Sequence, residues 1–447
     1  MLAYRSIHRL YAAASLAAAL SLSPLRAEEP CHVVLRAALS GEVVPDDDAL
    51  GAIVLSQPAA RREMLQVLAG IGAEGSSARR SERDQVLARL RAQLAPATQR
   101  IHRGLAEVDG RNPNAEHLIA AAFDIGAALG GPEDVPALVQ LAQRWPREGD
   151  VTLVAAQPLA LRGALSLLLA RHPDAAASVR QRLREAPDEL AGALVDALGD
   201  QESAAAARAL AGALGMRTGF DGQVLNRLQA VTRAGTLRLH ATELTPLRRF
   251  LAAQSAFERA QAALCLGNLD DQESIEHLIP LLRDSERSVV EAAHRSLGQL
   301  TALTIGPDHR RWERWYTEQQ ATWRERSAQV LARLRSSDRA EVLRALIDAA
   351  PLRLYRAALS EPLQEILESS DDAAVLVHAA AAVEGLRAVD ALGAVVELLE
   401  DPRKDVRERA LRTLRVLTGF ELPARPELWR ARLASSGAPR GAASQGR

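Results

Sequence analysis

The chain has 447 residues, 48% of them hydrophobic and 25% charged, with a formal net charge of -1. This length exceeds the usual size of one compact core, and this composition excludes a disordered chain. A nearly neutral protein also lacks the overall positive charge that attracts nucleic acid or anionic lipid. Aromatic residues make up only 3% of the chain while alanine and leucine dominate, so we predict an all-α protein.

Residues 1–27 have the order of a secretory signal peptide. Basic Arg5 and Arg9 precede the apolar stretch Leu10–Leu22, and the small residue Ala27 follows. The apolar stretch is too short to span a bilayer, and no later one reaches the ~20 residues needed. We predict cleavage near Ala27, a periplasmic or secreted bacterial protein, and no stable membrane insertion after cleavage. The alternative is an ordinary amphipathic first helix.

The rest of the first half contains mostly helical patterns. Residues 28–110 are predicted to form a helical N-terminal region that caps an array, and residues 111–220 contain pairs of helices separated by turns. Residues 221–254 contain Gly235 and Pro246, which indicate a segment connecting two arrays.

A duplicated unit follows. Leu300-Thr301 aligns with Leu417-Thr418 and Trp312 with Trp429, at a spacing of 117 positions and without a gap. The alignment extends over some fifty residues. Apolar residues recur in it at i, i+3 and i+4, which is typical of stacked helical pairs.

Local signals in the second copy predict how its helices begin and pack. Asp401 is expected to cap a helix at its N-terminus, with Pro402 in the first turn. Val406, Ala410 and Leu414 then form one buried stripe, in which the alanine permits close helix approach.

Two further signals predict how each copy ends. Gly419 is expected to end a helix in the left-handed conformation, although Ala302 stands at this position in the first copy. Trp312 and Trp429 are each expected to pack over the exposed end of an array.

The pattern of Asp401-Pro402, Val406-Arg407 and Ala410-Leu411 resembles the HEAT and phycobilisome-lyase-type HEAT-like repeat family. The resemblance implies an α-solenoid of stacked antiparallel helix pairs. The resemblance predicts HEAT-like repeats in three ranges. These are residues 111–220, residues 255–335 with a Trp-bearing closing helix, and residues 336–434 with a second closing helix. Residues 435–447 are small and polar, which predicts a disordered tail.

The two cysteines are too few for a disulfide framework. Cys265 aligns with Ala382 on an apolar helix face, so we expect a small buried residue there rather than a bridge to Cys31.

One segment offers a candidate binding surface. Residues 309–335 hold three of the five tryptophans together with several arginines, a combination that could stack on bases or grip phosphates. Predicted export, interspersed glutamates and the genomic arginine bias argue against nucleic acid, since Lys404 is the only lysine of the chain. We favour a structural helix, and the functional candidate is a protein-binding surface at Arg310, Arg311, Arg314 and Trp315.

No catalytic, cofactor or metal site is predicted. The histidines form no HExxH motif, and the pairs Glu116-His117 and Glu276-His277 are interpreted as exposed helix-turn residues. We therefore predict an exported, non-catalytic binding or scaffold protein that contacts another protein or a cell-envelope component. The alternatives are a lyase-type enzyme or enzyme accessory, as the resemblance allows, and a purely structural envelope component.

Overall fold

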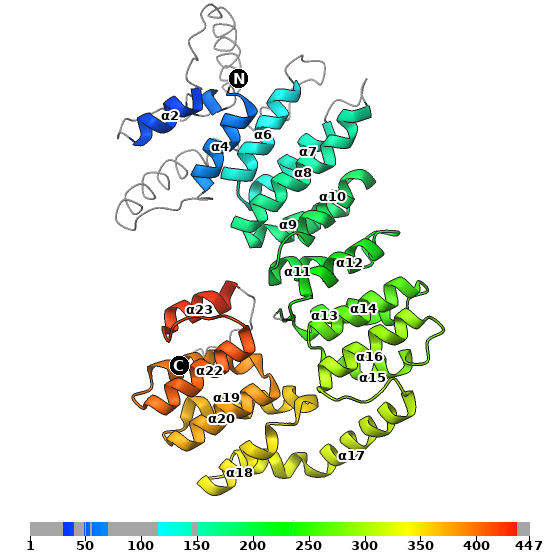
Figure 1. The fold of residues 1–447 in the computed structure, drawn as a ribbon, viewed down its shortest axis with the longest axis vertical. Helices are drawn as coiled ribbons and strands as arrows, with labels where there is room; N and C mark the ends of the chain where they lie inside the picture. Colours follow the sequence, from blue (N-terminus) through cyan, green and yellow to red (C-terminus); the bar gives the residue numbers. More distant parts are fainter. Residues whose placement is uncertain are drawn as a thin grey trace, which may run out of the picture. The chain divides into compact units, whose positions relative to one another are not determined.

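The computed structural model describes residues 30–39, 49, 51–53, 56–69, 115–144, 151–235 and 237–435. All regular structure in this part of the chain is helical (Figure 1), which confirms the predicted all-α class. No helix within the described residues is long and apolar enough to cross a membrane. The predicted signal peptide and the tail after residue 435 lie outside the described residues.

The chain divides into two compact units, residues 1–201 and 202–447. This division falls within the predicted 111–220 array, and the other predicted boundaries stay predictions. In the first unit, α4 packs on α6, α6 on α8 and α8 on α10. Its described helices are α2 (Pro30–Leu39), α4 (Pro58–Ala69), α6 (Ala115–Leu129), η1 (Pro132–Asp134), α7 (Val135–Arg144), α8 (Val151–Arg171), η2 (Pro173–Ala175), α9 (Ala176–Leu183) and α10 (Asp188–Gly199).

The second unit begins with α11 (Ala204–Ala211), α12 (Asp221–Thr232), α13 (Ala241–Arg249) and η3 (Phe250–Ala252). The predicted connecting segment 221–254 therefore contains two helices, and both pack against α14 (Ala256–Asn268). The reason is that Leu225, Leu228 and Leu247 are fully buried, so this segment contributes to the core. The remaining helices are η4 (Gln272–Ser274), α15 (Ile275–Leu281), α16 (Arg287–Thr301), α17 (His309–Leu334), α18 (Arg339–Ala349), η5 (Arg353–Tyr355), α19 (Arg356–Ser369), α20 (Ala373–Leu386), η6 (Val389–Ala391), α21 (Leu392–Glu397), η7 (Leu398–Glu400), α22 (Lys404–Thr418) and α23 (Pro426–Ser435).

The duplication seen in the sequence is also a structural duplication. The helices α14, α15, α16 and α17 begin 117 positions before α20, α21, α22 and α23, respectively. Contacts are duplicated too: α14 packs on α16 as α20 does on α22, and α15 on α17 as α21 does on α23. The predicted unit of stacked helices is thus confirmed for this part of the chain.

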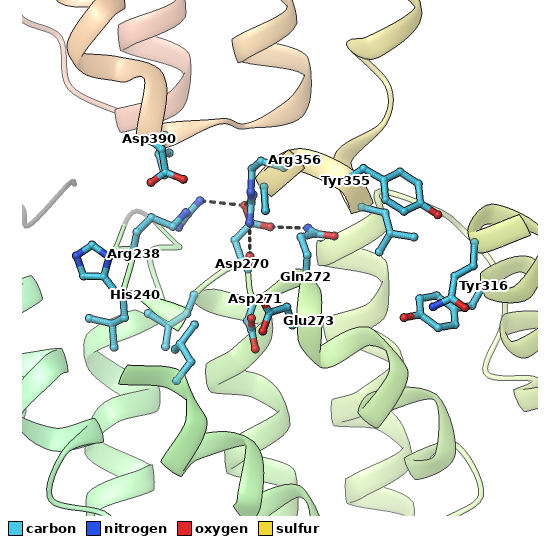
Figure 2. A pocket seen from close by; sticks show the side chains of 17 residues that line it. Arg238, His240, Asp270, Asp271, Gln272, Glu273, Tyr316, Tyr355, Arg356 and Asp390 are labelled. Carbon is cyan, nitrogen blue, oxygen red and sulfur yellow. Dashed lines mark hydrogen bonds and ion pairs between the residues drawn. The ribbon is translucent and has the colours of Figure 1, made fainter. Parts of the chain in front are cut away.

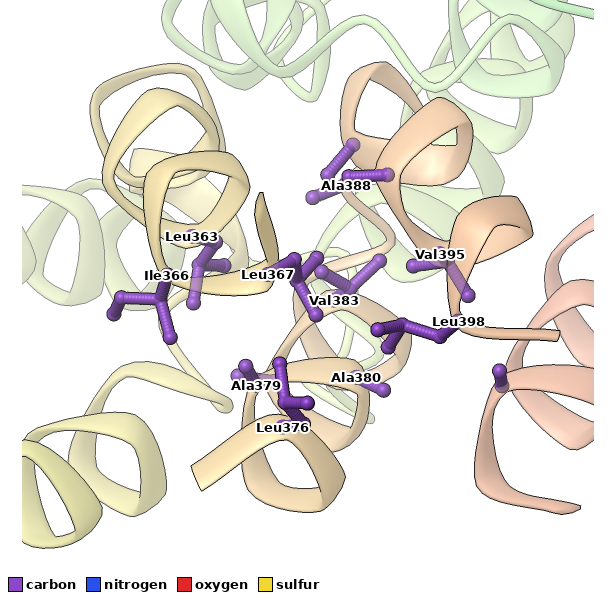
Figure 3. Packing of buried hydrophobic residues seen from close by; sticks show 14 of the residues in the cluster. Leu363, Ile366, Leu367, Leu376, Ala379, Ala380, Val383, Ala388, Val395 and Leu398 are labelled. Carbon is purple, nitrogen blue, oxygen red and sulfur yellow. The ribbon is translucent and has the colours of Figure 1, made fainter. Parts of the chain in front are cut away.

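The core of the second copy is made of leucine and valine against alanine (Figure 3). Leu363 and Leu367 of α19 face α20, whose Ala379 and Ala380 are fully buried. Small side chains at these positions let neighbouring helices approach closely, so that larger residues fill the space between them. The predicted stripe on α22 (Val406, Ala410, Leu414, Leu417) is buried as expected.

The predicted start of α22 is wrong by two residues. Arg403, in an extended conformation, is the N-cap, and Pro402 precedes it. The Asp401 carboxylate accepts a hydrogen bond from the Arg403 backbone N–H at 2.8 Å, so it orders the turn before the helix. Asp284 does the same for the Glu286 N–H at 3.0 Å in the first copy.

The repeated ending of the two copies has one geometry. Ala302 and Gly419 both adopt left-handed conformations, with φ of 58° and 72°. Trp312 and Trp429 are fully buried, and each indole Nε1–H donates at 2.9 Å to the carbonyl six residues earlier, of Gly306 and Pro423. Both tryptophans are therefore buried in the same way, while their predicted role of closing an array stays a prediction, because α17 is followed by α18, which packs against it.

The threonine of the repeated ending has a bonding role as well. The Thr301 hydroxyl donates to the Leu297 carbonyl at 2.7 Å and accepts from the Leu303 N–H. Thr418 repeats the first bond with the Leu414 carbonyl at 2.6 Å. The hydroxyl thus connects the last helical turn to the chain that leaves it.

Candidate anion-binding cleft

A cleft of about 330 Å³ lies in the second unit, where turns of the two copies meet (Figure 2). We call it the basic cleft. Its polar lining comes from segments far apart in sequence: the residues before α13 (Arg238, His240), the turn after α14 (Asp270, Asp271, Gln272, Glu273), α17 (Tyr316, Gln320), the η5–α19 junction (Tyr355, Arg356) and η6 (Asp390).

Asp270 is the centre of the cleft's hydrogen-bond network. Its backbone is left-handed, with φ of 59°, and its side chain is only 4% exposed. Arg356 donates to the Asp270 carboxylate at 2.5 Å and to the Asp270 backbone carbonyl at 2.7 Å. Gln272 donates to the same carboxylate at 3.1 Å. Asp270 therefore connects the first copy to Arg356, at the start of α19.

Three guanidinium groups share the Asp270 carboxylate. Besides Arg356, Arg238 lies at 3.5 Å and Arg387 at 3.9 Å from its Oδ2. The pKa of Arg238 is lowered to about 10, mainly by burial; Asp270 opposes this shift, and the neighbouring Arg387 and Arg356 add to it. One carboxylate does not balance these cations, so the electrostatic potential of the cleft favours an anion.

Most of the acidic side chains near the cleft already have a partner. Arg248 donates to both Asp271 carboxylate oxygens at 2.7 Å and contacts Glu273 at 2.8 Å. Ser274 donates a further hydrogen bond to Asp271. Asp390 is exposed and has no ion pair among the described residues.

The charges around the cleft nearly balance. Arg353, which does not line the cleft, donates to the Gly385 carbonyl at 2.9 Å; burial first, and then Arg387, lower the pKa of Arg353. Of the charged residues that line the cleft, two are arginines (Arg238, Arg356) and four are acids (Asp270, Asp271, Glu273, Asp390). Arg248, Arg353 and Arg387 do not line the cleft, and with them the cluster around it has five guanidinium groups and four carboxylates.

Three buried polar atoms at the cleft have no hydrogen-bond partner within the described part of the chain: Arg238 Nε, Gln272 Oε1 and the Tyr355 hydroxyl. The Tyr355 ring stacks on Trp323 of α17 at 4.3 Å between centroids. Burial raises the pKa of Tyr355 to about 12, so its hydroxyl is a neutral donor at physiological pH.

The residues predicted from sequence lie elsewhere. Arg310, Arg311 and Arg314 are exposed, and helical spacing places them on the side of α17 opposite to Tyr316 and Gln320. Trp315 is half-buried and meets the buried Trp312 edge to face at 5.6 Å. The structure therefore does not bring the three arginines into the cleft, and their role as a binding surface stays a prediction.

Sequence reasoning missed the cleft because its residues belong to five separate segments. A signal was present in the duplication, since Asp270 and Arg387 are equivalent positions with opposite charge. No group of three or more His, Cys, Asp or Glu residues in the described part could hold a metal ion. Both cysteines are free and buried. The expected lack of enzyme activity and of a cofactor stays a prediction.

No known protein family and no curated protein matches this sequence. Among solved structures, an engineered protein is similar at 16% identity over 84% of this chain and 99% of its own, with a TM-score of 0.29. Kap121p bound to Pho4p is similar at 13% identity over 97% of this chain and 49% of that chain, with a TM-score of 0.32. The karyopherin Kap121p bound to the extreme C-terminus of the protein phosphatase Cdc14p gives 12% identity, the same two coverages and a TM-score of 0.31.

The chain thus spans about half the length of the Kap121p chains. At these identities and TM-scores, the similarities assign neither a family nor a partner to this protein.

Proposed function

We propose that this chain is a non-catalytic binding scaffold whose basic cleft anchors a negatively charged segment of a partner protein. The observation that carries the proposal is the sharing of one buried carboxylate by three guanidinium groups at an open cleft. Such an arrangement attracts an anion. The packed helices around the cleft hold the cationic groups in position before the partner binds.

The lining and position of the cleft favour a protein segment over an apolar small molecule. Small-molecule pockets are mostly apolar, whereas charged and amide side chains make up much of this lining. The cleft also adjoins α17, a helix of 26 residues in which only Trp312 and Leu334 are buried. A partner seated at Tyr316 and Gln320 would therefore find further exposed surface along the same helix.

The proposal includes export. The support is the order of charge, apolar residues and Ala27 in the first 27 residues of the sequence. The partner is then a periplasmic, secreted or cell-envelope protein. The mass of the chain recovered from the extracytoplasmic fraction tests this part: loss of residues 1–27 supports it, and an intact chain in the cytoplasm contradicts it.

Site-specific photocrosslinking in intact cells tests the binding itself. A benzophenone amino acid replaces Gln320, which lines the cleft, and in a matched variant it replaces Ala321, which is exposed on the same helix but outside the cleft. We expect a discrete crosslinked protein from position 320, weaker crosslinking from 321, and loss of the first product when Arg238→Gln is added. Equal crosslinking at both positions, or none, would overturn the proposal.

A further inference from the structure

We infer that the two copies are joined by a hinge with an ionic latch. The latch is the contact of Arg356 with Asp270, which holds the copies closed over the basic cleft; its release lets them move apart about α17. The inference goes beyond the proposed function and does not depend on the identity of a ligand. Three observations carry it: an interrupted helix stack, the ionic contact between the copies, and unsatisfied polar atoms beside that contact.

The stack of helices is interrupted between the copies. In the first copy α12 packs on α14 and α14 on α16, and in the second α18 packs on α20 and α20 on α22. Within the described residues, α16 and α18 do not continue this series. The connection is α17 (Figure 1), which packs on α15 of the first copy and on α18 and α19 of the second. Only Trp312 and Leu334, near the two ends of α17, are buried, so its long middle part belongs to neither core.

An ionic contact joins the copies where the stack is interrupted. Arg356, at the start of α19, donates to the Asp270 carboxylate at 2.5 Å and to the Asp270 backbone carbonyl at 2.7 Å. The two side chains are only 14% and 4% exposed. Removing the guanidinium leaves a buried carboxylate short of a cation, which strongly weakens the closed form. Polar contacts of this kind between compact parts of a chain permit relative motion, whereas a large apolar interface does not.

Unsatisfied polar atoms oppose the latch. Arg238 Nε and Gln272 Oε1 of the first copy and the Tyr355 hydroxyl of the second are buried without a hydrogen-bond partner in the described part of the chain. All three residues line the cleft between the copies (Figure 2). A buried polar atom without a hydrogen bond costs free energy that contact with water recovers. The closed form thus combines a stabilising latch with destabilising atoms beside it, which is the balance that a two-state hinge needs.

Double electron–electron resonance on the full-length chain measures the opening. Spin labels are attached to cysteines that replace the exposed Asn226 of α12 and Asp405 of α22, while the buried Cys31 and Cys265 become alanine. We expect one dominant distance and a second, less populated one. Arg356→Gln should raise the ratio of the second to the first at least tenfold, as for a lost charged hydrogen bond. Arg356→Lys keeps the charge without the planar fork, so its rise should be smaller.

Tyr355→Phe tests the opposing side. It keeps the ring that stacks on Trp323 and removes the unsatisfied hydroxyl, so it should lower the ratio about threefold or more, both alone and combined with Arg356→Gln. Arg430→Gln is the control, because it breaks an ion pair with Glu397, at 2.6 Å, that lies within the second copy. This control should leave both distances and their ratio unchanged.

Circular dichroism spectra establish that each variant is folded, and Arg356→Lys provides the comparison if Arg356→Gln does not fold. One distance only in the natural chain and in the Arg356 variants would overturn the inference. A change in Arg430→Gln equal to that in Arg356→Gln, or a higher ratio in Tyr355→Phe, would overturn it as well.

Discussion

Asp270 and Arg387 occupy the same position of the two copies, 117 residues apart, and they meet in the structure. Both have left-handed backbones, with φ of 59° and 57°, and Arg387 Nε lies 3.9 Å from Asp270 Oδ2. The duplication thus produced two equivalent turns, and one carries an acid where the other carries a base. Where the turns face each other, this difference makes them attract and places the basic cleft between them.

Asp270→Asn should destabilise the second unit by about 3 kcal/mol or more, because removing one member of a buried ionic cluster leaves the other charges uncompensated. Asparagine keeps the shape and tolerates the left-handed backbone, so the change isolates charge. Urea unfolding followed by circular dichroism measures the loss. Arg387→Gln is the control, and since Arg387 is 35% exposed it should cost under about 1 kcal/mol. Equal losses in the two variants would show that Asp270 is not the centre of the cluster.

Ala302 and Gly419 provide a matched pair for the cost of the left-handed turn. Ala302→Gly should raise the free energy of unfolding by about 1 kcal/mol, and Gly419→Ala should lower it by about the same amount. The reason is that both residues have positive φ, at 58° and 72°, and only glycine adopts it without strain. Urea unfolding of both variants is the measurement, and a change of the same sign in the two would refute the explanation.

Trp429→Phe should cost about 2 kcal/mol, because it leaves the Pro423 carbonyl without the indole donor and removes buried surface. Trp312→Phe should cost a similar amount, since its indole donates to Gly306 at the same 2.9 Å. Trp315→Phe is the control, with a smaller expected loss, because Trp315 is only half-buried. Thermal and urea unfolding compare the three. A cost at position 315 equal to that at 429 would contradict the closing role.

Asp401 should make stability depend on pH in the acid range. The hydrogen bond from the Arg403 guanidinium, with that from the Arg403 backbone, holds the pKa of Asp401 below its ordinary value, against the effect of burial. The folded protein therefore binds the proton less readily than the unfolded chain. This contribution is complete above the unfolded pKa of about 4 and is lost as the pH falls through the lower, folded value.

Asp401→Asn should accordingly destabilise the protein by about 1 kcal/mol at pH 7, with a difference from the natural chain that shrinks below about pH 4. Urea midpoints between pH 7 and pH 2.5 measure it. Glu318→Gln, at an exposed position of α17, is the control and should run parallel to the natural chain. A difference for Asp401→Asn that stays constant to the lowest pH would contradict the linkage.

The sequence by itself determined the helical class, the duplication and the equivalence of the two aligned tryptophans. These features depend on local periodicity and on identical residues in register, as at Ala410 and Trp429, and short-range packing forces the same structure on both copies. The start of α22 was placed two residues early, because Asp401 and Pro402 fit the usual pattern of an N-cap and first turn, whereas Arg403 is identified as the N-cap only by its backbone conformation.

The basic cleft was decided by the tertiary structure alone. Arg238, Asp270 and Arg356 are separated by 32 and 86 positions and have no shared local pattern, so their meeting depends on how successive helices stack. Burial then converts ordinary surface-type residues into an ionic cluster with a shifted arginine pKa. The tryptophan- and arginine-rich segment of α17 shows the reverse: its sequence suggested a site, while its helical geometry turns Arg310, Arg311 and Arg314 away from the cleft.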